Sequence, residues 1–311
     1  MRDAGGLRIR RGRPDDTRAC HELMWQAATD LGNRRGTPLD GTADDWWHGM
    51  GAVHEQLEES AAEWWVAALD GADGLEGGLI GYARSIERGG LVELTEFFVQ
   101  PGRQGAGLGR ALLDRTFPVG RGEIRSIIAT SDERALRRYY EAGVVARFPF
   151  LALSADPADT PPPGDIHPER ITDLRAADAV VDVERAVLGY PRGQREIRAL
   201  LREREGWLYR GGADGTTGDT IGYAFVGPAG SGPIATLEAR DLPGVLLHVE
   251  SRARALGMAK LELEVPSVAE TAVRHLLDRG YRISPWLNLL MSDRPFGQFD
   301  RFIGFSPPLF L

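Results

Sequence analysis

One glycine-rich segment constrains the fold of this chain more than any other feature. It reads Val99-Gln100-Pro101-Gly102-Arg103-Gln104-Gly105-Ala106-Gly107-Leu108-Gly109-Arg110, and it leads from an apolar strand through a turn into a helix. Glycines at 105, 107 and 109 remove the side chains that would keep an anion from the backbone, and the helix start contributes its positive dipole end. The segment is therefore suited to hold a phosphate group.

The spacing of this turn separates it from two well-known classes of nucleotide-binding loop. A P-loop ends in Gly-Lys-Ser or Gly-Lys-Thr, whereas this turn has no lysine and ends in Gly109-Arg110-Ala111. A dinucleotide-binding turn opens a parallel βαβ unit. Here the strands predicted before the turn, at 63–70, 79–86 and 91–99, form an antiparallel meander.

The spacing Gln104-x-x-Gly107-x-Gly109, preceded by Val99-x-Pro101, resembles the pyrophosphate loop of the GNAT superfamily of N-acetyltransferases. That loop grips the pyrophosphate of acetyl-coenzyme A. The resemblance extends to a predicted helix at 132–142, which carries Ala135 and Tyr139 on one face and ends at Gly143, as the fourth helix of the family does. A first strand at 7–10, a first helix at 14–31 and a fifth strand at 124–129 complete one GNAT domain over residues 1–155.

The second half of the chain repeats features of the first beyond a polar, proline-rich linker at 156–165. Ile80-Gly81-Tyr82-Ala83 recurs as Ile221-Gly222-Tyr223-Ala224, and the pair Ala135 and Gly143 recurs as Ala272 and Gly280 with the same spacing. The chain is therefore predicted to be an α+β protein of α/β/α layers. It would hold two GNAT-like domains in tandem, 1–155 and 166–311, each a mostly antiparallel twisted sheet flanked by helices.

The two copies differ in their chemistry. At the position of the glycine-rich loop the second copy reads Thr236-Leu237-Glu238-Ala239-Arg240-Asp241-Leu242-Pro243-Gly244, without spaced glycines, and Leu276 stands in the place of Tyr139. We therefore expect cofactor binding and catalysis in residues 1–155. The second, degenerate copy would pack against the first, shape the acceptor pocket or dimerise.

The resemblance implies a set of site residues in the first domain. Tyr139 would protonate the departing thiolate or hold it by a hydrogen bond, with Tyr140 as the competing hydroxyl. Glu96 would be the general base, with Glu93 or water alone as alternatives, and a bulge in the strand would decide which glutamate faces the cleft. The co-substrate acetyl-CoA would bind to the fourth strand and the loop, at Phe97, Phe98, Val99, Gln104, Gly105, Ala106, Gly107, Leu108, Gly109 and Arg110.

The function implied is acetyl-CoA-dependent N-acetyl transfer to a primary amine of a small molecule, by direct attack in a ternary complex. The alternatives are an acyl-CoA-binding sensor or scaffold without turnover, an acyltransferase for longer acyl groups, and an aminoacyl transferase. We expect the first two helices to shape the acceptor pocket, where Asp44-Asp45-Trp46-Trp47-His48 offers a tryptophan wall with carboxylates. A core tryptophan beside an acidic helix start explains the same residues.

Composition excludes some classes of partner. The formal net charge of -8 disfavours nucleic acid and suits an amine substrate. Cys20 is the only cysteine, which fits a reducing cytoplasm, and the lack of an apolar run of about 18 residues predicts no membrane span. His48 and His54 lack a third ligand nearby, so no metal site is predicted. The aromatic tail at 296–311 is expected to dock on a domain or across a dimer interface, with monomer and homodimer both open.

Overall fold

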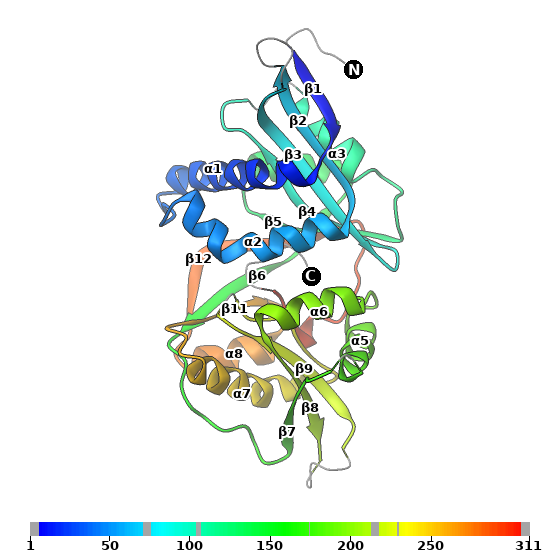
Figure 1. The fold of residues 1–311 in the computed structure, drawn as a ribbon. Helices are drawn as coiled ribbons and strands as arrows, with labels where there is room; N and C mark the ends of the chain where they lie inside the picture. Colours follow the sequence, from blue (N-terminus) through cyan, green and yellow to red (C-terminus); the bar gives the residue numbers. More distant parts are fainter. Residues whose placement is uncertain are drawn as a thin grey trace. The chain divides into compact units, whose positions relative to one another are not determined.

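The computed structural model describes residues 6–70, 76–103, 107–173, 175–212, 218–228 and 230–305 of the 311-residue chain. Gln104, Gly105 and Ala106 of the predicted loop lie outside the described residues, as does the end of the tail at 306–311. The chain divides into two compact units, the first made of 1–127 and 132–145 and the second of 128–131 and 146–311 (Figure 1). Each unit is an α+β fold of its own.

The first unit is built around an antiparallel meander, as predicted. Its strands follow the order β1-β2-β3-β4-β5, antiparallel from β1 to β4 and parallel between β4 and β5. The elements are β1 (Leu7–Arg11), η1 (Pro14–Asp16), α1 (Thr17–Arg35), α2 (Ala43–Ser60), β2 (Ala61–Asp70), β3 (Glu76–Arg88), β4 (Leu91–Val99), α3 (Leu108–Thr116), β5 (Ile124–Thr130) and α4 (Glu133–Glu141).

The first helix differs from its predicted span of 14–31. Pro14–Asp16 forms a separate 3-10 turn, and α1 begins at Thr17. It continues to Arg35 because its stop signal is Gly36, which closes the helix in the left-handed conformation with a φ of 70°. The four additional residues at its C-terminus include Arg34, which pairs with Asp132 just before α4.

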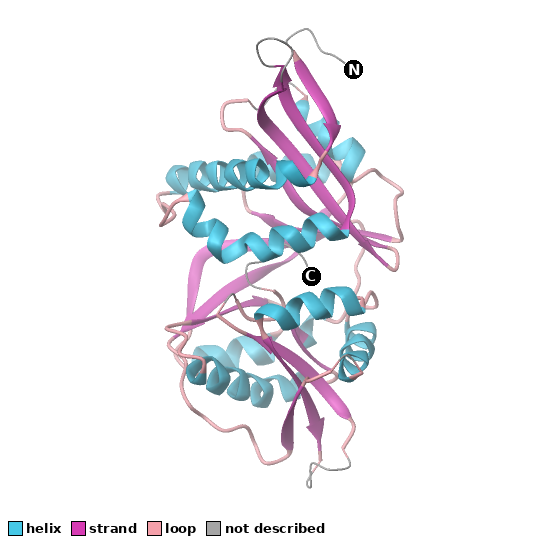
Figure 2. Ribbon diagram, in the orientation of Figure 1, coloured by secondary structure: helices cyan, strands magenta, loops and turns pink. Residues whose placement is uncertain are grey.

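Helices cover both faces of this sheet (Figure 2). Successive residues of a strand point to opposite faces, and two neighbours on β3 identify which helix lies where. Tyr82 packs with Cys20 and Leu23 of α1 in one core cluster. A Cβ added at Gly81 would lie 3.2 Å from Leu112 of α3. The helices α1 and α3 therefore lie on opposite faces.

Two irregularities in β4 shape its C-terminal half. Arg84 pairs with Glu96 while Ser85 pairs with Leu94, so Thr95 is an extra residue at a bulge. In addition, β4 pairs with β5 only from Leu91 to Glu93 among the described residues. Beyond Glu93 the described backbone of β4 has no pairing with β5, and this stretch includes Phe97, Phe98 and Val99, where the resemblance implies that acetyl-CoA binds.

The second unit repeats the element order of the first. It contains β6 (Val145–Ala155), β7 (Ile166–Arg170), α5 (Ala176–Val187), α6 (Gln194–Glu203), β8 (Glu205–Gly211), β9 (Thr220–Val226), β10 (Ile234–Thr236), η3 (Ala239–Asp241), α7 (Leu242–Ala255), β11 (Leu261–Pro266), α8 (Glu270–Asp278), β12 (Arg282–Ser292), η4 (Phe299–Arg301) and β13 (Phe302–Ile303). One sheet has the order β13-β10-β9-β8-β7, and β6 lies between β12 and β11.

The division of the chain differs from the expected boundary at residue 155. All of β6 except Val145 belongs to the second unit, because Phe150–Ala155 pairs with Leu261–Pro266 of β11 over six residues. The expected linker, 156–165, holds no helix or strand and lies inside the second unit. A strand at the end of the first repeat thus pairs with a strand of the second repeat.

The described part of the aromatic tail docks on the second unit. Phe299, Phe302, Ile303 and Phe305 are buried. Residues Phe302 and Ile303 pair with β10, and the amide of Gly304 donates to the carbonyl of Glu264 on β11 at 2.7 Å. The tail therefore lies against both β10 and β11, the strands that correspond to β4 and β5 of the first unit.

Candidate active site

The first turn of α3 presents backbone amides that the helix itself leaves unpaired. Gly107 precedes the helix with a φ of 80°, and no side chain of a described residue caps it. The first helical hydrogen bond runs from the amide of Ala111 to the carbonyl of Gly107. The amides of Leu108, Gly109 and Arg110 therefore have no acceptor within the helix, which is the arrangement that binds phosphate at helix N-termini.

Phe97 connects this helix start to Tyr139. A Cβ added at Gly109 would lie 3.1 Å from Cζ of Phe97, so only a glycine lets the first turn of α3 approach the ring this closely. The Phe97 ring also meets the ring of Tyr139 edge-on, with centroids 6.0 Å apart. These three predicted site residues are therefore brought together.

Tyr139 is the buried one of two adjacent tyrosines on α4. It is 6% exposed, whereas Tyr140 is 52% exposed. Burial raises the pKa of Tyr139 far above its ordinary value, and the nearby charge of Asp132 adds to this effect. Its hydroxyl makes no hydrogen bond to the described residues. Tyr139 therefore keeps its proton at neutral pH.

Glu96 lies in a closed polar cluster. Its carboxylate accepts a hydrogen bond from the Tyr82 hydroxyl at 3.0 Å and lies 3.1 Å from the Arg84 guanidinium. His54 Nδ1 is 3.4 Å from Oε1 of the same carboxylate. Burial alone would raise the pKa of Glu96, but Arg84, His54 and Tyr82 outweigh it and lower that pKa to about 2. Glu96 is therefore ionised and shielded from solvent.

The bulge at Thr95 brings Glu93 to the same face of the sheet as Glu96. Because Thr95 has no partner, the two glutamates fall two pairing positions apart instead of three. Glu93 forms a buried ion pair with Arg88. Both candidate bases thus face the side of the sheet covered by α1, and each is neutralised by an arginine of β3.

Four residues of this cluster were not predicted as site residues from the sequence: Tyr82, Arg84, His54 and His21, whose Nδ1 lies 3.0 Å from Nε2 of His54. The alternation of β3 carried a signal for two of them, because Tyr82, Arg84 and Ile86 share one face, and a charge in a buried series requires a partner. Arg84 is fully buried and stacks on Trp64, with its Cζ 4.2 Å from the ring centroid. No sequence spacing indicated the two histidines.

The segment Asp44-Asp45-Trp46-Trp47-His48 at the start of α2 has a structural explanation. Asp45 closes a capping box with Thr42, and Asp44 pairs with Arg18 of α1. Trp47 stacks on His54, with centroids 6.0 Å apart and planes inclined by 11°. The segment therefore acts as a helix start with a packing anchor, the second of the two interpretations given above.

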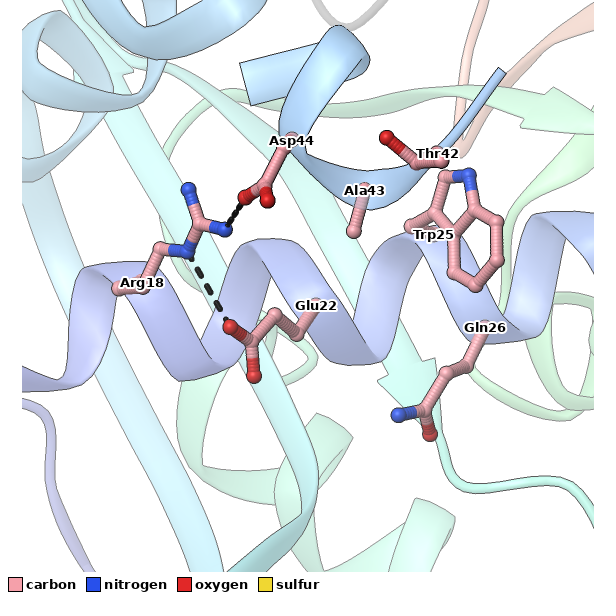
Figure 3. Close-up of a pocket in the computed structure, with 7 residues that line it drawn as sticks. All are labelled: Arg18, Glu22, Trp25, Gln26, Thr42, Ala43 and Asp44. Carbon is pink, nitrogen blue, oxygen red and sulfur yellow. Dashed lines mark hydrogen bonds and ion pairs between the residues drawn. The ribbon is translucent and has the colours of Figure 1, made fainter. Parts of the chain in front are cut away.

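A surface groove of about 370 Å³ lies between α1 and the start of α2 (Figure 3). Arg18 occupies one end, where its guanidinium reaches toward both Glu22 and Asp44. A second groove, of about 440 Å³, is lined by residues of α3 and α4 that include Arg110 and Arg138. Across the described residues, no three or more His, Cys, Asp or Glu side chains gather to hold a metal, and no helix has the length and apolarity to cross a membrane.

Comparisons with known proteins find one matching family model and several solved structures with the same fold. Residues 18–144 match the model of the Acetyltransferase (GNAT) family. No curated protein matches the sequence. A candidate acetyltransferase from Pyrococcus horikoshii has a TM-score of 0.70 at 15% identity, covering 96% of this chain and 93% of that one. A GCN5-related N-acetyltransferase from Sphaerobacter thermophilus has a TM-score of 0.58 at 17% identity, covering 93% and 96% of the two chains.

A tandem GNAT protein from the clavulanic acid biosynthesis pathway also shares the fold, with a TM-score of 0.55 at 15% identity over 93% of this chain and 99% of that one. The predicted α+β fold with antiparallel sheets flanked by helices is thereby confirmed. Residues 18–144 form an acetyltransferase domain of the GNAT family, within a chain that has the fold of a tandem GNAT protein.

Proposed function

We propose that the first unit transfers an acetyl group from acetyl-CoA to a primary amine of a small molecule, by direct attack in a ternary complex. One observation carries the proposal: the start of α3 and the hydroxyl-bearing ring of Tyr139 both adjoin Phe97, and neither has a side-chain hydrogen-bond partner among the described residues. An anion-binding helix end beside a protonated phenol suits a substrate with a pyrophosphate at one end and a thioester at the other.

The proposed reaction assigns a role to each of these groups. The lone pair of the amine attacks the thioester carbon, a C–N bond forms, and the C–S bond breaks. The amine loses one proton, and the thiolate leaving group takes one from Tyr139 or is held by its hydroxyl. Backbone groups of β4 beyond Glu93, free of β5, are the proposed donors that stabilise the oxyanion.

The base in this proposal is water, the third of the alternatives. A carboxylate whose pKa is lowered to about 2 and whose surroundings are closed is a weak acceptor for an ammonium proton. Glu93 is equally buried and pairs with Arg88. We propose that Glu96 acts at a distance, by fixing the polar cluster beside Phe97.

Three features of the second unit support placing all chemistry in the first. Asp241 occupies the N-cap of α7, where a carboxylate repels phosphate. Leu276 is buried at the position of Tyr139 and carries no proton to donate. The tail residues Phe302–Gly304 lie against β10 and β11, whereas in the first unit the described part of β4 beyond Glu93 has no pairing with β5.

Isothermal titration with acetyl-CoA tests the proposal. The wild type is compared with a Gly107→Trp, Gly109→Trp double variant and with Gly36→Trp. Gly36 is the control for Gly107, since both are positive-φ glycines at a helix end with no atom within 4 Å of the missing Cβ. We expect one site per chain, lost in the double variant and kept in the control, with circular dichroism verifying the fold.

The outcomes separate the alternatives. An absence of binding to the wild type would rule out acyl transfer from acetyl-CoA, and two sites would show that the second unit also binds it. Binding without thiol release against a panel of primary amines would favour the sensor or scaffold. Release with longer acyl-CoA only would identify a different acyl group.

A further inference from the structure

Four charged side chains link the end of α1 to the start of α4. Arg34 of α1 donates through Nη2 to Oδ2 of Asp132 at 3.1 Å. Arg134 of α4 donates through Nη2 to Oδ2 of Asp30 on α1 at 3.3 Å. Within the helices, Arg34 Nε also donates to Asp30 at 3.1 Å, and Arg134 Nη2 donates to Asp132 at 2.8 Å. We call these four residues the α1–α4 clasp, in which each arginine contacts one carboxylate of either helix.

The clasp connects helices that lie on opposite faces of the sheet. Tyr82 of β3 packs with α1. Phe97 pairs with Ala83, the next residue of β3, and therefore points to the other face. On that face Tyr139 of α4 packs on Phe97. The contact between α1 and α4 is therefore made around the end of the strands and not through the sheet.

The clasp lies at the carboxyl end of β5. Asp132 comes two residues after Thr130, the last residue of that strand. Because β4 and β5 are parallel, their carboxyl ends lie at the same end of the sheet, and the described part of β4 has no pairing with β5 beyond Glu93. The clasp is therefore at the same end of the sheet as the segment of β4 to which the proposed function assigns the thioester.

Asp132 is the central member of the clasp. Its Oδ1 accepts from the amide of Arg134 at 3.0 Å and caps α4, while its Oδ2 accepts from both arginines. Burial alone would raise the pKa of Asp132, but the hydrogen bonds from Arg134 and the charges of Arg134 and Arg34 outweigh it and lower that pKa. An isolated surface ion pair contributes little, whereas this carboxylate is ionised, 13% exposed and held from both helices.

Tyr139 is oriented from this capped end of α4. It lies seven residues after Asp132, about two helical turns along α4, and so on the same side of the helix. The charge of Asp132 acts on Tyr139, where it adds to the effect of burial on the pKa of the phenol. A shift at the start of α4 is therefore transmitted to the Tyr139 ring, because a hydrogen-bonded helix connects the two.

We propose that Arg34 is a positioning residue, which through Asp132 holds the start of α4 from the opposite face of the sheet and thereby sets the position of the Tyr139 ring on Phe97. The kinetic consequence of this inference rests on the proposed function, whereas the effect on the ring does not. A small displacement of a reacting group is costly for a positioned reaction. We expect an open clasp to lower kcat by about tenfold.

Two substitutions on α1 open the clasp and leave every residue of α4 unchanged. Asp30→Asn removes the carboxylate that Arg134 contacts, and Arg34→Ala removes the contacts with Asp132 and Glu133. The side chains of Asp30 and Arg34 are 30% and 34% exposed, so the double variant should fold, as circular dichroism can verify. The control is Arg137→Ala, which breaks an ion pair within α4, with Glu141 at 3.0 Å.

Fluorine nuclear magnetic resonance of the full-length protein labelled with 3-fluorotyrosine tests the positioning directly. Tyr139→Phe and Tyr140→Phe assign the two signals of α4. We expect the Tyr139 signal to shift in the double variant and to stay in place in Arg137→Ala. Arg34→Ala alone keeps the link between Arg134 and Asp30 and should shift the signal less. An unchanged Tyr139 signal in the double variant would overturn the proposal.

Steady-state kinetics and calorimetry test the consequence for the reaction. The double variant should lose about tenfold in kcat and keep the wild-type Kd for acetyl-CoA, because the start of α3 is not part of the clasp. Arg137→Ala should change neither quantity. Wild-type kcat in the double variant would refute the role of the clasp in the reaction. A wild type that binds no acetyl-CoA would refute the proposed function instead, and the fluorine signals would still decide whether Arg34 positions Tyr139.

Discussion

The ring of Tyr139 contacts Phe97 edge-on, with centroids 6.0 Å apart and planes inclined by 64°. Its neighbour Tyr140 is half exposed. Adjacent positions on α4 thus hold Tyr139, which packs on Phe97 of β4, and Tyr140, which is exposed to solvent. The pair offers a built-in comparison between two tyrosines on the same helix.

Tyr139→Phe is expected to lower kcat by about 100-fold, in the range of general acid catalysis. Acetyl-CoA affinity should change little, because the ring contact with Phe97 remains. Tyr140→Phe is the control and should leave kcat unchanged. Steady-state thiol release with one amine acceptor measures both. Equal effects of the two substitutions would contradict the assignment of Tyr139 as the proton donor.

The ion pair of Glu96 and Arg84 predicts a specific loss of stability in acid. The folded pKa of Glu96, about 2, lies below its ordinary value of 4.5, so its contribution is complete above about pH 4.5 and disappears as the pH falls toward 2. The difference corresponds to about 3 kcal/mol. Urea unfolding between pH 7 and pH 3 measures this decline.

Glu96→Gln should remove that part of the acid dependence. At pH 7 it should also destabilise the first unit by about 3 to 5 kcal/mol, since it leaves the Arg84 charge buried without its partner. Glu55→Gln, exposed on α2, is the control. Wild-type stability of Glu96→Gln at pH 7 would show that the buried charge is not held as described.

The same substitution is expected to have different effects at two helical glycines. Gly49 of α2 has no atom within 4 Å of its missing Cβ, so Gly49→Ala should raise the free energy of unfolding by about 1 kcal/mol. In Gly109→Ala the new methyl group would press on the Phe97 ring at 3.1 Å. That variant should gain less stability and bind acetyl-CoA more weakly, as calorimetry can measure. Tighter binding by Gly109→Ala would contradict the proposed site.

Local signals in the sequence predicted much of the fold and part of the site. Alternating apolar runs predicted the meander, and the glycine spacing predicted the turn into α3, because both depend on neighbours along the chain. The same holds for Tyr139, whose helix face follows from its spacing to Ala135. The pairing of β6 with β11 was not predictable, because strand partners distant in sequence depend on the whole fold.

The repeated Ile-Gly-Tyr-Ala motif shows that the sequence predicts the position of the tyrosine but not its hydrogen-bond partner. In the first unit the Tyr82 hydroxyl donates to Glu96 of β4, and Arg84 of β3 neutralises that carboxylate. In the second unit the Tyr223 hydroxyl donates at 2.7 Å to Glu184, which lies on α5 and pairs with Arg192. The tyrosine occupies the same position in both units, whereas its acidic partner lies on a strand in the first unit and on a helix in the second. A sequence comparison detects the shared tyrosine but not the change of partner.

The tail provides a test of the proposal that the second unit binds no acetyl-CoA. Phe302 is fully buried and pairs with β10, so Phe302→Ala should destabilise the second unit by about 3 to 5 kcal/mol. Acetyl-CoA stoichiometry should stay at one per chain, because Asp241 at the start of α7 still repels phosphate. Calorimetry on Phe302→Ala and on Phe302→Ala, Asp241→Ser measures the stoichiometry. A second site in the single variant would show that the tail alone closes the cleft, whereas a second site only in the double variant would assign that role jointly to the tail and to Asp241.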